Sequence, residues 1–187
     1  LHKLIFPTPG RYSEDIDLVQ REANPIGSLI NAIRDVLDPW LGKPKWKAGH
    51  GRFTLYYRFE TAFVPVTTMR VKIEINTREH FCVYDVVHRP FAVESKWFSG
   101  DADIPTYSAS ELLATKLRAL YQRKKGRDLF DLLLGLDHPE VVSHELLVAF
   151  QKYMDFTGAT VTRAQFEANM AAKMADATFA NDVPALL

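Results

Sequence analysis

The sequence has a single cysteine, Cys82, which excludes both an internal disulfide framework and a cysteine-rich metal site. It has no apolar run close to the roughly 20 residues of a membrane-spanning helix, so no membrane association is expected. Neither sign of charge is in excess, because basic and acidic residues both number 23. A polyanion could therefore be held only by a local group of basic side chains.

The N-terminus lacks two further features. It has no charged-then-apolar signal segment, so a cytoplasmic location is expected. The chain also begins at Leu1 rather than at methionine and enters structured-looking sequence at once, which indicates a truncated, processed or alternatively started chain. Its 187 residues suit one domain or two small lobes, and a hydrophobic fraction of 47% is sufficient for a core.

Hydrophobic periodicity predicts an α+β fold, with a mixed sheet over residues 1–106 and a helical lobe over residues 107–187. The clearest strand is 69–75, where apolar and charged residues alternate strictly. Further strands are expected over 11–19, 53–64, 81–87 and 91–98, and a helix over 26–41. Helices are expected in the second lobe over 108–122, 127–136, 141–153 and 163–179, the first and last opened by capping boxes.

Three carboxylates in the first lobe are candidates for a metal site. Asp15 and Asp17 would project from one face of a strand, where they repel each other unless a cation such as magnesium lies between them. Glu74 would join them if its strand is a neighbour, and three carboxylates can hold the two metal ions of a phosphoryl transfer. A solvated acidic turn and a solvent-facing strand explain the same residues without any metal.

Two segments of the second lobe contain charged residues of interest. Lys116 lies inside the apolar stripe of its helix, so it needs an anionic partner or must reach past the leucines to solvent. Asp128 is at a helix start, where a carboxylate favours the helix dipole, and Arg127 can pair with Asp131 four residues on. Helix stability alone is a sufficient explanation for this second segment.

Two basic groups could contact nucleic acid. The first interleaves cations with Trp40 and Trp46 in an expected loop, and consists of Lys43, Lys45, Lys47, His50 and Arg52. Aromatic rings among cations can bind a single strand, although a solvated connector has the same composition. The second group is Arg118, Arg123, Lys124, Lys125 and Arg127, which is nearer to the candidate site.

Three segments together resemble the AbiEii/AbiGii family of abortive-infection nucleotidyltransferases: RYSEDIDLV at 11–19, KIEIN at 72–76 and ELLATKLRALYQRKKGRDLFDLL at 111–133. Their order and spacing are similar to those of the family across most of the chain. The resemblance implies a polymerase-beta-like nucleotidyltransferase sheet with flanking helices, a Mg²⁺ or Mn²⁺ cofactor and a nucleoside triphosphate substrate. It also implies an acceptor hydroxyl on RNA, such as a tRNA 3′ end, or on protein, and a cognate antitoxin protein.

The resemblance also implies roles for individual residues. Asp15 and Asp17 would be the metal-binding pair, and Glu74 the third carboxylate, as metal ligand or as base toward the attacking hydroxyl. Asp128 would position Lys116 or the acceptor. Contacts with the nucleotide and its phosphates are implied for Ser13, Lys116, Arg123 and Arg127.

The sequence departs from the family pattern in one place. The family has a Gly-Gly-Ser/Thr turn shortly before the acidic pair, whose backbone N–H groups cradle the triphosphate. That turn is absent here, and Leu1-His2-Lys3-Leu4 resembles the sequence that follows it. This absence leaves open an interaction protein that keeps the fold without turnover. A metal-dependent nuclease is a third alternative, because clusters of carboxylates also cleave phosphodiesters.

Overall fold

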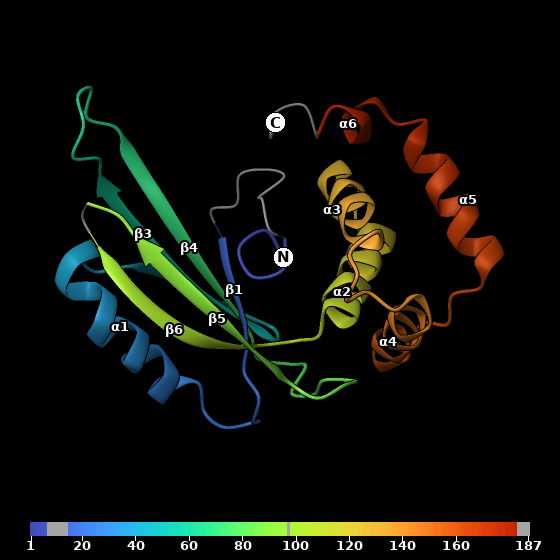
Figure 1. The fold of residues 1–187 in the computed structure, drawn as a ribbon, viewed down its shortest axis with the longest axis horizontal. Helices are drawn as coiled ribbons and strands as arrows, with labels where there is room; N and C mark the ends of the chain where they lie inside the picture. Colours follow the sequence, from blue (N-terminus) through green and yellow to red (C-terminus); the bar gives the residue numbers. More distant parts are fainter. Residues whose placement is uncertain (7–14, 97, 183–187) are drawn as a thin grey trace. The chain divides into compact units, whose positions relative to one another are not determined.

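The computed structural model describes residues 1–6, 15–96 and 98–182, and it divides into two compact units (Figure 1). One unit comprises residues 13–81, and the other joins residues 1–12 to residues 82–187. Strands and helices are both abundant, which confirms the α+β class expected from the sequence. The expected boundary near residue 106 coincides with the start of the helices but differs from the limits of these units.

The unit of residues 13–81 is a sheet with one helix packed against it (Figure 1). Its described elements are β1 (Asp15–Val19), α1 (Gly27–Leu41), β2 (Lys45–Gly49), β3 (Arg52–Glu60) and β4 (Thr68–Asn76). The strand order is β1-β4-β3-β2, with β1 parallel to β4 and the other neighbours antiparallel. This order places the first and last strands of the unit side by side.

Period-two alternation decides which face of this sheet is buried. Leu55 and Tyr57 of β3 and Ile73 and Ile75 of β4 form the core, and their side chains are at most 2% exposed. The apolar side chains of α1 and its flanking residue cover them, namely Ile26, Leu29, Ile33, Leu37 and Leu41. The expected helix over 26–41 and strand over 69–75 are therefore confirmed. The charged residues of β1 and β4 lie on the opposite face.

Tyr57 makes the stability of this unit sensitive to high pH. Its hydroxyl donates to Asp38 Oδ1 at 2.8 Å, and burial together with that hydrogen bond raises the pKa of Tyr57 from 10.0 to about 12. A raised acid pKa means that the stabilisation is complete below pH 10 and is lost as pH rises through 12. We expect the free energy of unfolding to fall on the order of 2 kcal/mol over that range, and less in Tyr57→Phe. Denaturant titrations at both pH values measure this, and equal losses in the two proteins would contradict it.

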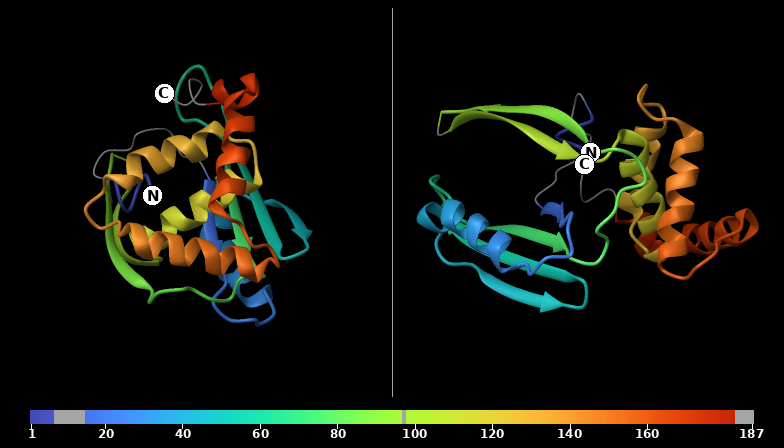
Figure 2. Two further views of the ribbon diagram at one scale, coloured as in Figure 1. Left: turned by 90° about the vertical axis from the view of Figure 1, so that its right-hand side faces the viewer. Right: turned by 90° about the horizontal axis from the view of Figure 1, so that it is seen from below.

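The second unit contains an antiparallel hairpin followed by packed helices (Figure 2). Its described elements are β5 (Val87–Glu94), β6 (Ser99–Thr106), α2 (Ala109–Gln122), α3 (Gly126–Leu136), α4 (Ser143–Phe156), α5 (Arg163–Met174) and α6 (Ala177–Ala180). Helix α2 packs against both α3 and α4, and the core lies between them. Over the described residues, every helix is too short or too polar to cross a membrane.

The expected strand over 81–87 is wrong, and β5 begins only at Val87. The backbone N–H groups of Val83 and Tyr84 donate to the buried carboxylate of Glu111, at 2.7 and 3.0 Å, rather than to a neighbouring strand. The Glu111 carboxylate therefore bonds to this segment. Of the capping box expected at Ser108, the hydrogen bond from the Glu111 N–H to Ser108 Oγ is present, at 3.2 Å. The box at Thr162 is complete, because Gln165 also bonds back to the Thr162 N–H.

The structure has two strands that the sequence analysis did not expect, and one expected helix is interrupted. The basic segment expected to be a loop is β2, which pairs with β3 across a turn in which Gly51 has a φ of 72°. Strand β6 was not expected, and it pairs with β5 along its whole length. The helix expected over 163–179 ends at Met174, and Asp176 caps the separate helix α6 by accepting from the Thr178 N–H.

Candidate active site

The acidic residues of β1 and β4 share one face of the sheet. Asp15 and Asp17 are two residues apart on β1, so both project from the same side. Strand β4 is the parallel neighbour of β1, and its register pairs Asp17 directly with Glu74 and Asp15 with Lys72. Register partners on adjacent strands point to the same face. Three carboxylates and one ammonium group therefore lie on the same face of the sheet, opposite α1.

Lys72 is the cation of this cluster. Its Nζ atom lies 2.5 Å from Asp15 Oδ2 and 3.6 Å from Glu74 Oε2. Burial alone would lower the pKa of Lys72, but the carboxylates of Asp15, Glu74 and Asp17 raise it above its ordinary value. Glu74 also pairs with the guanidinium of Arg52 at 3.4 Å. The cluster is therefore a cation-attracting site with two basic residues already in contact with it.

The metal ion that the resemblance implies can be tested against this arrangement. The three carboxylates supply the oxygen ligands that Mg²⁺ and Mn²⁺ prefer. Within residues 1–6, 15–96 and 98–182, however, no three histidine, cysteine, aspartate or glutamate side chains come close enough together to hold a metal ion. The three carboxylates are suitable ligands for a divalent ion. Lys72 would have to give up its ion pair with Asp15 before they could bind the ion together.

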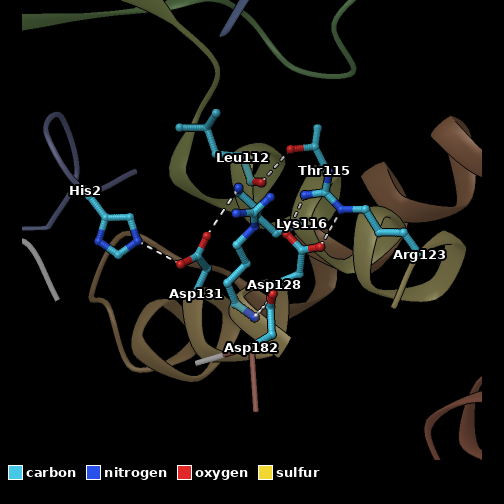
Figure 3. A network of polar contacts seen from close by, with 9 residues as sticks. His2, Leu112, Thr115, Lys116, Arg123, Asp128, Asp131 and Asp182 are labelled. Carbon is cyan, nitrogen blue, oxygen red and sulfur yellow. Dashed lines mark hydrogen bonds and ion pairs between the residues drawn. The ribbon is translucent and has the colours of Figure 1, made fainter. Parts of the chain in front are cut away.

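Lys116 contacts a carboxylate of its own unit. Its Nζ atom lies 3.2 Å from Asp131 Oδ2, and its side chain is 26% exposed, so it is accessible to solvent as well. Asp131 is fully buried and also receives His2 Nε2 at 2.8 Å on its other oxygen (Figure 3). Burying a carboxylate requires such charged and hydrogen-bonding partners. Asp131 therefore fixes the ammonium group of Lys116 at the surface of α2.

Asp128 is the second fully buried carboxylate of α3. Arg123 donates to both of its oxygens, from Nε at 2.7 Å and from Nη2 at 2.8 Å (Figure 3). This two-pronged pair joins the C-terminal end of α2 to the first turn of α3. Asp128 and Asp131 are three residues apart, so they share one face of α3. Each of the two candidate cations on α2 thus has its own buried carboxylate on α3.

Other expected site residues have different positions. The expected i,i+4 pair of Arg127 with Asp131 is not among the ion pairs of the described residues, where Asp131 pairs with Lys116 and His2. The backbone N–H of Arg127 donates to Asp182 Oδ2 at 3.3 Å. Ser13, a candidate phosphate contact, lies outside the described residues.

The candidate residues are divided between the two units. Asp15, Asp17 and Glu74 belong to the unit of residues 13–81, whereas Lys116, Arg123, Arg127 and Asp128 belong to the other. In the first unit the three carboxylates share one face of the sheet, and in the second Arg123 pairs with Asp128, whereas Lys116 and Arg127 contact Asp131 and Asp182 instead. The role of every one of these residues in a reaction stays a prediction.

The sequence interpretation placed Lys72 on the polar face of its strand with Glu74 but gave it no part in the site. It considered Asp131 only as a partner of Arg127, although a second carboxylate one helical turn from Asp128 on a largely apolar helix is a candidate of its own. His2 had no local signal, because its partner Asp131 is 129 residues away in sequence.

Comparisons with known proteins address the family directly. No curated protein and no solved structure matches the chain significantly. The family model described as nucleotidyl transferase AbiEii toxin, type IV toxin–antitoxin system, matches residues 1–187. Because this match extends over the whole chain, the protein belongs to the AbiEii family of nucleotidyl transferase toxins of type IV toxin–antitoxin systems.

Proposed function

We propose that this chain transfers a nucleotide from a nucleoside triphosphate to a hydroxyl group of RNA, with the 3′ end of a tRNA as the acceptor. The hydroxyl oxygen forms a bond to the α-phosphate, and pyrophosphate leaves. Family membership supports the class of reaction. The observation that carries the site is the register of β1 and β4, which sets Asp17 beside Glu74 and leaves Asp15 on the same face. A protein hydroxyl as acceptor is the alternative that the same chemistry allows.

In this proposal Asp15, Asp17 and Glu74 hold Mg²⁺ or Mn²⁺. A divalent ion bound there would supply charge stabilisation for the developing phosphoryl transition state. Glu74, the register partner of Asp17, acts either as the third ligand of that ion or as the base that takes the proton from the attacking hydroxyl. Lys72 leaves its pair with Asp15 and neutralises phosphate charge instead.

Lys116 has a different part in the proposal. Its ammonium group, held by Asp131 at 3.2 Å, contacts the phosphates of the triphosphate. Arg123 donates to both carboxylate oxygens of Asp128. It therefore positions the start of α3 and keeps a fixed positive charge close to that helix. A cognate antitoxin protein is the expected partner of the toxin, as the type of system implies.

The experiment incubates the chain with Mg²⁺, each of the four labelled nucleoside triphosphates, and total RNA or total protein. We expect one or more nucleotides to label RNA, and tRNA whose 3′ ribose has been oxidised with periodate should take up no label. Label in protein alone would identify a protein acceptor and contradict the RNA proposal. Shortened RNA without label would favour a nuclease, and no change in either fraction would favour an interaction protein without turnover.

Replacing Lys116 with methionine tests the proposed phosphate contact. We expect the KM for the triphosphate to rise about tenfold, because a charged hydrogen bond of about 1.4 kcal/mol is lost. Lys152→Met, at an exposed position of α4, is the matched control and should leave the KM unchanged. Steady-state kinetics on proteins with measured unfolding curves gives the answer. A lower kcat at constant KM in Lys116→Met would contradict a ground-state phosphate contact.

A further inference from the structure

The polar face of the sheet extends well beyond the carboxylates. Cross-strand register places its side chains in rows that run from β2 to β1. One row is Lys45, Tyr56, Lys72 and Asp15, and the next is Lys47, Thr54, Glu74 and Asp17. Each row therefore begins at a lysine on the edge strand and ends at a candidate catalytic aspartate, about 14 Å away at about 4.8 Å per strand.

Further cations continue this face along β3 and β4. Arg58 and Arg70 are register partners in the row beyond Lys45, and both side chains are exposed. The guanidinium of Arg70 lies over the ring of Tyr56, 6.0 Å from its centroid. Across the described part of the chain, no ion pair involves Lys45, Lys47 or Arg58. We call the five residues Lys45, Lys47, Arg58, Arg70 and Tyr56 the basic strip.

The strand geometry corrects the aromatic platform expected from the sequence. Trp46 alternates with Lys45 and Lys47, so on a strand it points to the opposite face. It stacks there on Phe53, with ring centroids 5.7 Å apart and planes at 15°. The aromatic ring that accompanies the lysines is instead Tyr56, the register partner of Lys45.

We propose that the basic strip binds the backbone of a single-stranded RNA acceptor and leads it toward the carboxylates of β1 and β4. This inference rests on the proposed function for the identity of the acceptor. The strip and Arg52 extend about 20 Å along β3, at about 3.4 Å per residue, and across the two strand spacings from β2 to β4. Several backbone phosphates can cover that distance, whereas one triphosphate cannot. Exposed cations beside an aromatic ring are also the combination that binds single strands without sequence preference.

Binding of a fluorescein-labelled single-stranded RNA of about 12 nucleotides to the full chain, followed by anisotropy over a salt series, tests the strip. In Lys45→Ala/Lys47→Ala we expect about tenfold weaker affinity. The slope of log K against log salt should fall by about 1.4, at about 0.7 for each lost phosphate contact. Lys45→Arg/Lys47→Arg keeps both charges and should restore binding.

The control is Lys3→Ala/Lys152→Ala, which removes the same charge from exposed positions of the other unit. It should retain wild-type affinity. Equal weakening in both double variants would overturn the inference, and so would a higher KM for the triphosphate in Lys45→Ala/Lys47→Ala with RNA affinity unchanged. RNA binding that depends on the two lysines, in a chain that transfers no nucleotide, would support the strip while refuting the proposed function.

Discussion

Glu111→Gln is expected to lower the free energy of unfolding by about 3 kcal/mol. The Glu111 side chain is fully buried, and its carboxylate accepts three hydrogen bonds. Val83 N–H and Tyr153 O–H donate to Oε1, at 2.7 and 2.6 Å, and Tyr84 N–H donates to Oε2 at 3.0 Å. The pKa of Tyr153 is raised above its ordinary value, mainly by burial and next by the hydrogen bond that its hydroxyl donates to Glu111.

Glutamine cannot reproduce this set of bonds in either orientation. If its amide nitrogen takes the place of Oε2, it faces the N–H of Tyr84. If it takes the place of Oε1, it faces the N–H of Val83. Either way one buried backbone donor meets another donor and loses its partner, which is more costly than the loss of an exposed hydrogen bond.

Urea unfolding followed by circular dichroism measures this loss. Glu167→Gln, on the exposed side of α5, is the control and should change the free energy of unfolding by about 0.5 kcal/mol or less. Tyr153→Phe removes only the hydroxyl donor and should fall between the two, near 1 kcal/mol. A Glu111→Gln protein as stable as the wild type would show that the carboxylate does not hold the segment before β5.

Asp17→Asn is expected to reduce nucleotide transfer by roughly 10²–10³-fold while the fold is retained. Asparagine keeps the shape of the side chain but removes a negative charge from the face that Asp17 shares with Glu74. Backbone hydrogen bonds hold β1 against β4, and the substitution leaves them in place, so we expect the sheet to form as in the wild type. Initial rates with a labelled triphosphate and RNA, at saturating Mg²⁺, give the measurement.

Asp35→Asn is the matched control for this variant. Asp35 is an exposed aspartate of α1 in the same unit, on the element that covers the other face of the sheet. It should retain the wild-type rate. Transfer by Asp17→Asn at the same rate as by Asp35→Asn would remove Asp17 from the proposed centre.

The strand pattern of residues 69–75 and the helix over 26–41 could be predicted because one face of each is apolar and the other polar. Neighbour relations between strands could not be predicted, since the partner of β1 is a strand more than 50 residues later in the chain. That relation decides whether Glu74 stands beside Asp17. The sequence therefore indicated the three carboxylates, and only the register showed that they share a face.

The errors have local causes. Residues 81–86 are rich in strand-forming residues, but the N–H groups of Val83 and Tyr84 donate to the carboxylate of Glu111, which is 28 and 27 residues away in sequence. Lys45 and Lys47 suggested a loop because charged residues surround Trp46, although β2 is a short edge strand with every residue exposed. In both segments the hydrogen-bonding partner decides the structure, Glu111 for Val83 and Tyr84 and the adjacent strand β3 for β2.

The sequence left two alternatives open for Lys116: an anionic partner, either a bound triphosphate or a carboxylate, and solvent. In this structure the partner of Lys116 is Asp131 of the same unit, and His2 contacts the other carboxylate oxygen of Asp131. Both contacts depend on how α2, α3 and the N-terminal residues pack. A pattern of leucines around a lysine predicts that a partner is needed but does not identify it.

The proposed catalytic centre is the carboxylate face of β1 and β4, and Mn²⁺ binding tests this proposal most directly. Electron paramagnetic resonance would follow Mn²⁺ titrated into the full chain, with and without a nucleoside triphosphate, for the wild type and for Asp15→Asn/Asp17→Asn. We expect the wild type to bind Mn²⁺ more tightly when the triphosphate is present, and the double variant to bind none. Equal binding by both proteins, or no binding by the wild type under either condition, would contradict it.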